Sequence, residues 1–343
     1  MARDGRGSPS VDAGFFLGID GGASKTAGAM LSGTGRLLAT FRTGGSAIVG
    51  KPSIEACAVL AEVVVGLCRA AGCSRDRVSY CAIGLNGVDF ADTQPMQHAE
   101  IARAIGLPPD RMTLVNDGIV ALWAATPTPA ATLLQHGSGF TGAYRRQHGE
   151  EVLFDHLHVG DTYDLRRGLV AAVARMIDGR QDPTPLKDCT LARFAIADEA
   201  AYCEAVYRGT IQRDRLKNTA PLVFEAWLAG DPAAAQLVQR AVDDYALAAR
   251  AMVALIGSDD ADVVFGGGVI LRGPGQFWDL LADKVRSHCP KARTKRPDLP
   301  PEIGAAIMAA YEAERRSEQW ITAAFEASAA PAKKERQGTE NDR

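Results

Sequence analysis

Short apolar runs and amphipathic stretches follow one another through the first half of the chain. An apolar run over 15–20 ends in a carboxylate and a small-residue turn, and two more extended runs follow at 26–31 and 37–42. The pattern then predicts helices at 53–71, 92–105 and 118–125, and strands at 78–85 and 112–115. The resulting order is three strands and then α, β, α, β, α, which predicts an α/β domain over 14–126.

The second half repeats the beginning of the first. After the Thr126-Pro127-Thr128-Pro129 linker, a buried strand at 131–134 runs into Gly137-Ser138-Gly139, and two extended pieces follow. Further helices are predicted at 163–178, 231–256, 274–288 and 301–314, with a strand at 262–265 that leads into Gly266-Gly267-Gly268. We therefore expect a second domain over 130–316, with polar, disordered ends at 1–13 and 327–343.

Composition narrows the class of protein. The 343 residues suffice for two hydrophobic cores, and a net charge of −3 favours neither a nucleic-acid nor a membrane partner, so we expect a small-molecule substrate. The seven cysteines have no C-x-x-C spacing, and their odd number argues against a disulfide framework. With no signal core or spanning run, the sequence predicts a cytoplasmic protein.

The first strand leads into a loop suited to phosphate. The loop reads Gly21-Gly22-Ala23-Ser24-Lys25-Thr26. Glycines let backbone N–H groups approach a ligand, Ser24 and Thr26 add hydroxyl donors, and Asp20 before the loop could hold a phosphate-bound Mg²⁺. The ending differs from a Walker A loop, because Ser24 stands where that motif has glycine and a strand follows instead of a helix. The alternative is an ordinary hairpin turn with an exposed Lys25.

Three glycine turns at strand ends, spread over both halves, resemble the duplicated actin-like (ribonuclease H-like) fold of sugar kinases. Within that superfamily the chain resembles the BadF/BadG/BcrA/BcrD ATPase family, which includes N-acetylglucosamine kinases. Besides the three turns, the resemblance rests on Gly84-Leu85-Asn86-Gly87, Val115-Asn116-Asp117, Asp178-Gly179-Arg180 with Pro183-Thr184, and Gly304-Ala305. It covers residues 14 to 316.

The resemblance implies roles for these motifs around an active site in an interdomain cleft. The aspartate that matches Asp117 is the base that accepts the proton of the sugar hydroxyl, although Asp117 could also cap the following helix. Gly137, Ser138 and Gly139 would bind the ATP phosphates opposite the first loop, and Gly266, Gly267 and Gly268 would lie against adenosine. ATP and Mg²⁺ are thus the expected cofactors.

One stretch departs from the family pattern. Family kinases form part of the sugar pocket with a Gly-Gly-Trp-Gly stretch and a Gly-Asp-Glu-Gly-Ser loop, whereas residues 154–163 here keep only the Gly160-Asp161 pair. Asp161 is a candidate for hydrogen bonding to sugar hydroxyls, or for capping the helix that begins near Tyr163. His156 and His158 could line the pocket or lie on the strand surface. We also assign substrate contacts to Asn86, Gly87, Asn116 and Asp117.

The expected function is ATP-dependent phosphorylation of a sugar or amino sugar, of the N-acetylglucosamine or glucosamine kind. Two alternatives remain: an ATPase that activates a partner reductase or dehydratase through an iron–sulfur cluster between subunits, and a non-catalytic sugar or nucleotide sensor. Dimers are common in families of this kind, so a homodimer is also considered.

Overall fold

The computed structural model describes residues 14–137, 139–154, 157, 162–211 and 219–340, with side chains described up to 329. Its strands are β1 (Phe15–Gly21), β2 (Thr26–Ser32), β3 (Leu37–Thr43), β4 (Val78–Leu85), β5 (Met112–Val115), β6 (Ala131–His136), β7 (Phe140–Arg145), β8 (Glu151–Leu153), β9 (Asp262–Gly266) and β10 (Arg293–Lys295). Its α-helices are α1 (Ile54–Ala71), α2 (Gln94–Ile105), α3 (Asp117–Ala125), α5 (Leu165–Ile177), α6 (Pro185–Phe194), α7 (Glu199–Tyr207), α9 (Ala220–Leu228), α10 (Pro232–Ile256), α11 (Gly268–Leu271), α12 (Gly275–His288), α13 (Pro301–Glu314) and α14 (Glu318–Glu340). Short 3₁₀ turns, η1 (Arg75–Arg77) and η2 (Pro109–Arg111), precede β4 and β5.

Local sequence signals set the ends of several helices. The Ser53 hydroxyl accepts the Ala56 N–H at the start of α1, and Gly72 ends that helix at a φ of 64°. The Asp231 carboxylate accepts two N–H groups at the start of α10, ahead of Pro232. These predicted caps are confirmed.

Contacts divide the chain into two units, and each is described by itself. Unit 1 takes in the described parts of Met1–Leu133, Ala143–Leu153 and Arg296–Arg343, and unit 2 takes in those of Leu134–Gly142 and Phe154–Lys295. The division differs from the expected domains, because the last part of the chain returns to unit 1.

The sheet of unit 1 has the strand order β3-β2-β1-β4-β5. The first three strands form an antiparallel meander, while β1, β4 and β5 run parallel to one another. The carboxyl ends of these three parallel strands therefore lie along one edge of the sheet. Ligand-binding loops of open α/β sheets are found at such edges.

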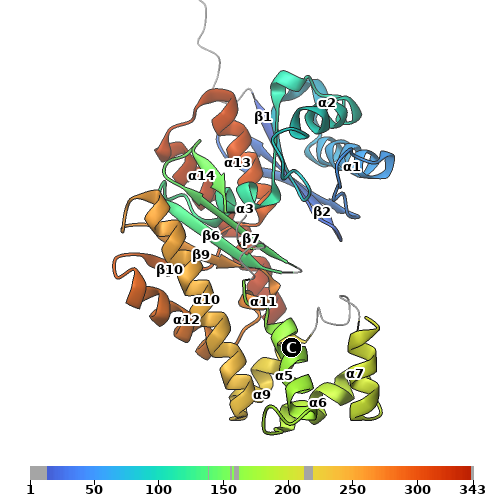
Figure 1. Cartoon of the computed structure of the whole chain (residues 1–343). Coiled ribbons are helices and arrows are strands. Elements are labelled where there is room, and N and C mark those ends of the chain that lie inside the picture. Colours follow the sequence, from blue (N-terminus) through green and yellow to red (C-terminus); the bar gives the residue numbers. More distant parts are fainter. Residues whose placement is uncertain (1–13, 138, 155–156, 158–161, 212–218, 341–343) are drawn as a thin grey trace, which may run out of the picture. The chain divides into compact units, whose positions relative to one another are not determined.

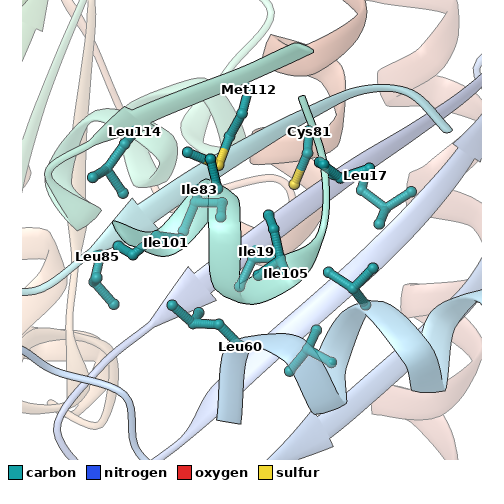
Figure 2. Close-up of a cluster of buried hydrophobic side chains, with 14 of the residues drawn as sticks. Leu17, Ile19, Leu60, Cys81, Ile83, Leu85, Ile101, Ile105, Met112 and Leu114 are labelled. Carbon is teal, nitrogen blue, oxygen red and sulfur yellow. The ribbon is translucent and has the colours of Figure 1, made fainter. Parts of the chain in front are cut away.

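Alternation along β1 separates the two faces of this sheet. Leu17 and Ile19 are buried in the cluster that α1 and α2 complete, together with Ile83 and Leu85 of β4. Figure 2 shows these side chains converging with Ile101 and Ile105 of α2 and with Met112 and Leu114 of β5. This cluster is the main core on that face of unit 1.

Helix α13 covers the opposite face of β1 (Figure 1). A Cβ added to Gly18 would lie 2.0 Å from the Ala306 backbone nitrogen, and one added to Gly304 would lie 2.3 Å from the nitrogen of Ala124 in α3. The two glycines permit this close approach of backbones. The approach explains why residues 301–314 belong to unit 1 rather than to the second domain predicted for 130–316.

The C-terminal segment also differs from the expectation. The sequence predicts a disordered tail at 327–343, whereas α14 runs Glu318–Glu340. Ile321, Ala324 and Phe325 are buried, and the Trp320 indole N–H donates to the Gly33 carbonyl. A helical stripe of apolar residues begins just before the polar tail and carries the helix into it.

The other sheet has the order β10-β9-β6-β7-β8, with β10 parallel to β9 and β8 antiparallel to β7. Helices α5 to α12 all belong to unit 2. Among the described helices, none combines the length and the apolar character needed to cross a membrane.

Candidate functional site

Two predicted site carboxylates lie at the edge of the unit 1 sheet where the parallel strands end. Asp20 is the penultimate residue of β1, and Asp117 begins α3 directly after β5. The Asn116 side chain caps α3, because its Oδ1 accepts the Gly118 N–H at 2.8 Å. The capping role considered for Asp117 thus belongs to the preceding residue.

The pKa values of both aspartates are raised. Burial, followed by the charges of Asp117 and Glu302, raises the pKa of Asp20 to about 7, against the opposing charges of Lys25 and Arg42. Burial also raises the pKa of Asp117, although a hydrogen bond from the Asn86 side chain opposes the shift. The carboxylates near Asp20 contribute more negative charge than Lys25 and Arg42 offset. This excess of negative charge favours binding of a cation. We call Asp20, Asp117 and Glu302 the acidic edge.

Glu302 is the member that the sequence analysis did not find. This second residue of α13 is only 4 % exposed. Its Oε1 lies 3.5 Å from Arg42 Nη2, and its Oε2 has no hydrogen-bond partner among the described residues. A glutamate two positions before the Gly304-Ala305 motif was the signal available in the sequence.

The acidic edge fits Mg²⁺ by its chemistry. Carboxylate oxygens suit this ion, which in phosphate sites is held by one or two carboxylates together with waters and substrate phosphates. Within the described part of the chain, no three His, Cys, Asp or Glu residues group closely enough to hold a metal ion by themselves. A magnesium ion would therefore depend on oxygens of the ligand as well as on Asp20.

The first loop is a tight hairpin turn. The Gly22 N–H donates to the Lys25 carbonyl at 2.9 Å, and Ala23, Ser24 and Lys25 are exposed at its tip. Thr26 differs from the expectation of a phosphate donor, since its side chain is buried and its Oγ1 donates to Ser46 Oγ. The exposed tip thus retains the polar groups that can meet a ligand.

A neighbouring segment supports this loop. The Ser46 N–H donates to the Gly22 carbonyl at 3.0 Å, and a Cβ on Gly45 would lie 2.3 Å from the Ala23 carbonyl oxygen. The sequence analysis did not assign this segment, although Gly44-Gly45-Ser46 directly after the third strand was a visible signal. Backbone hydrogen bonds therefore hold the loop in place from one side.

Polar side chains surround Asp117 at the ends of β4 and β5. Asn116 Nδ2 donates to Asp89 Oδ1 at 2.7 Å, and the Asn86 side chain hydrogen-bonds Asp117. Gly87 has a φ of 101° and its Cα lies against the Ile48 carbonyl, so it shapes the turn that carries Asn86. Amides and carboxylates together match the donors and acceptors of a polyol.

Unit 2 brings the other two predicted loops together. Gly267 has a φ of 83°, and a Cβ there would lie 2.4 Å from the His136 carbonyl oxygen, so the 266–268 turn lies against the start of the 137–139 turn. The Gly137 N–H donates to the Gly139 carbonyl at 2.9 Å. Only glycine meets both requirements at position 267.

Four predicted positions lie outside the described residues: Ser138, His156, His158 and Asp161. The residue that caps α5 is Asp164, whose Oδ1 accepts the Arg166 N–H at 2.8 Å.

The chain is similar to several known proteins. It is 22 % identical over 308 residues to N-acetylmuramic acid/N-acetylglucosamine kinase of Clostridium acetobutylicum, covering 88 % of this chain and 99 % of that protein. A crystal structure of a candidate N-acetylglucosamine kinase from Chromobacterium violaceum matches 88 % of this chain and 100 % of its own, with a TM-score of 0.62 and 23 % identity. The ROK hexokinase of Thermus thermophilus matches 87 % of this chain and 97 % of its own, with a TM-score of 0.56 and 19 % identity.

These likenesses, together with the two helix-covered sheets, confirm the predicted α/β fold class. In addition, a sequence model of the BadF/BadG/BcrA/BcrD ATPase family matches residues 17–309, most of the length of the chain. The protein therefore belongs to the BadF/BadG/BcrA/BcrD ATPase family.

Proposed function

We propose that this protein transfers the γ-phosphate of ATP to a hydroxyl of a sugar or amino sugar. The observation that carries the proposal is the acidic edge: a half-buried carboxylate, Asp117, lies beside hydrogen-bonding amides at the strand ends where Asp20 also stands. The kinase names of the relatives support the same reaction class. The substrate we propose is of the N-acetylglucosamine or glucosamine kind.

In this reaction the Asp117 carboxylate accepts the proton of the attacking sugar hydroxyl. The hydroxyl oxygen forms a bond to the γ-phosphorus as the bond to the ADP oxygen breaks, so ADP leaves and the proton stays on Asp117. The raised pKa of Asp117 improves its ability to take that proton. Asn86, Gly87 and Asn116 contribute to the sugar subsite.

The glycine loops bind the nucleotide. Gly21, Gly22, Ala23, Ser24 and Lys25 approach the phosphates, as do Gly137, Ser138 and Gly139, and Gly266 to Gly268 receive the adenosine. Mg²⁺, held in part by Asp20, would offset the phosphate charge near the acidic edge. Thr26 stabilises the first loop through Ser46 in this proposal.

The test is ADP release by the purified protein with Mg-ATP and a panel of sugars. The panel comprises N-acetylglucosamine, N-acetylmuramic acid, N-acetylmannosamine, glucosamine and glucose, with mass spectrometry of the products. We expect one sugar to stimulate ADP release and to gain the mass of one phosphoryl group. ATP binding without a stimulated product for any sugar would overturn the kinase proposal in favour of a sensor or an activating ATPase.

A further inference from the structure

A buried ion pair lies directly behind the glycine turn at 137–139. Arg166 is 5 % exposed and binds Asp164 through two parallel bonds, from Nε to Oδ1 at 2.9 Å and from Nη2 to Oδ2 at 2.7 Å. Its remaining terminal nitrogen, Nη1, donates to the Gly137 carbonyl oxygen at 2.9 Å. A rigid guanidinium thus links a fixed carboxylate to the turn.

His136 extends this network toward α10. Arg166 Nη2 lies 3.2 Å from His136 Nε2, and His136 Nδ1 lies 2.5 Å from the Tyr245 hydroxyl. Because a guanidinium can only donate, Nε2 accepts, and Nδ1 carries the proton that it donates to Tyr245. Burial lowers the pKa of His136 from its ordinary value, which agrees with a neutral ring.

His136 also supports the predicted adenosine-binding turn at 266–268. The His136 backbone lies against Gly267, where a Cβ would be 2.4 Å from the His136 carbonyl oxygen. The His136 ring stacks on Phe140 at a centroid distance of 4.0 Å, immediately beyond the turn. His136 and Gly137 are therefore held in place by Arg166 and by packing against Gly267 and Phe140.

We propose that Arg166, held by Asp164 and His136, positions the 137–139 turn and thereby determines the affinity for ATP without touching it. Glycine has no side chain to anchor it, so the Gly137 carbonyl depends on the guanidinium for its orientation. A turn that is ordered before the ligand arrives loses less conformational entropy on binding. This inference rests on the proposed function, because it assumes that the turn binds phosphate.

The sequence did not suggest this role. Arg166 is the second residue of α5, shortly after the 154–163 stretch that departs from the family pattern, and an Arg-Arg pair in a helical pattern indicates only a solvated face. Burial of one arginine of the pair, Arg166, is what distinguishes it. A buried arginine without a counter-ion would lower the free energy of unfolding, so Asp164 is needed to hold Arg166 in this position.

The test compares Arg166→Met and Arg166→Lys with Arg286→Met in the full-length protein. Arg286 also pairs with an aspartate, at 2.8 Å between its Nη1 and Asp283 Oδ1, but that pair is exposed on α12. Each variant is measured for the Kd of Mg-ATP without sugar, for KM of ATP and of sugar, for kcat and for Tm.

We expect Arg166→Met to raise Kd and KM for ATP at least tenfold, Arg166→Lys to raise them by less, and the KM for sugar to stay within twofold. Arg286→Met should match the wild type. A lowered Tm with an unchanged Kd for ATP would show a merely structural pair and overturn the proposal.

If Arg166→Met does not fold, Tyr245→Phe removes one hydrogen bond at the far end of the network. We expect a two- to fivefold rise in Kd for ATP from this change, and an unchanged Kd in the folded variant would contradict the proposal. Wild-type protein that binds no ATP would instead overturn the proposed function, which separates the two failures.

Discussion

Asp20 in unit 1 and Asp164 in unit 2 are two largely buried aspartates near predicted phosphate loops, and their surroundings push them in opposite directions. The carboxylates of Asp117 and Glu302 add to burial and raise the pKa of Asp20 to about 7. Burial also acts on Asp164, but the two hydrogen bonds and the positive charge of Arg166 outweigh it and hold the pKa of that carboxyl well below its usual range. The uncompensated charge at Asp20 favours binding of a cation, whereas the compensated charge at Asp164 is typical of a structural ion pair.

The largest effect that this comparison predicts is on turnover at the acidic edge. Asp117→Asn removes the proton acceptor while keeping the size of the side chain, so we expect kcat to fall about 10³-fold. The Kd of ATP should change by less than threefold, because Asp117 is assigned to the sugar hydroxyl. Initial rates with the best sugar of the panel, together with nucleotide titration, measure both quantities.

A matched control is Asp110→Asn, an exposed aspartate in the turn before β5. Its kcat should equal that of the wild type. Unchanged turnover in Asp117→Asn would remove Asp117 from the mechanism.

The next largest effect is expected on the free energy of unfolding, from the ion pair of Asp164 with Arg166. Asp164→Asn leaves the buried Arg166 without its carboxylate and should lower the free energy of unfolding by about 3 kcal/mol. Urea denaturation at pH 7.5 followed by circular dichroism measures this change. A loss below about 0.5 kcal/mol would mean that the pair contributes little, and the contrast with Asp20 would then lose its basis.

The same substitution at the acidic edge should act in the opposite direction. Asp20→Asn removes a charge that is buried near two other carboxylates, so we expect the free energy of unfolding to rise by about 1 kcal/mol. The measurement is the same urea denaturation, carried out without Mg²⁺ and nucleotide, since a bound cation would mask the repulsion. A destabilised variant would show that the carboxylate is compensated after all.

The smallest predicted effect is a pH dependence that originates in unit 2. Burial lowers the pKa of His136 in the folded protein, while the unfolded residue keeps a value near 6.5. Between pH 7 and pH 5 the unfolded chain therefore binds more protons at this site, and stability falls as pH falls. We expect the stability advantage of wild type over His136→Gln to shrink by about 1 kcal/mol over that range.

The comparison with His136→Gln cancels other titrating groups, including those of the acidic edge. Asp164, Arg166 and Tyr245 face His136 in both proteins, so their direct contributions cancel to first order. Denaturation midpoints at pH 7, 6 and 5 give the difference directly. A difference that stays constant with pH would indicate that His136 titrates alike in the folded and unfolded chains.

Local patterns predicted most of the secondary structure and two of the three members of the acidic edge. Apolar alternation and caps such as Ser53 and Asp231 act over a few residues, so they can be read directly along the chain. Asp20 and Asp117 were predictable because each stands at the carboxyl end of a recognisable strand, and parallel strands end at one edge. The two glycine turns of unit 2 were predictable for the same reason.

The remaining features depend on long-range packing. Glu302 meets the acidic edge because α13 returns to β1 from almost 300 residues away, through the backbone approach at Gly18. Arg166 reaches the Gly137 carbonyl across 29 positions, and nothing in its local sequence sets it apart from Arg167. Hydrophobic periodicity shows which face of a helix or strand is buried, but not which other element packs against that face.

By itself, the sequence determined where most of the strands and helices lie, which of them end in carboxylates or glycines, and to which family the chain belongs. Only the tertiary structure decided how the charges are balanced, with Asp20 placed among carboxylates and Asp164 against a guanidinium. The physical reason is that a side chain's pKa depends on burial and on charges within several ångströms, and those neighbours are set by folding rather than by adjacency in the chain.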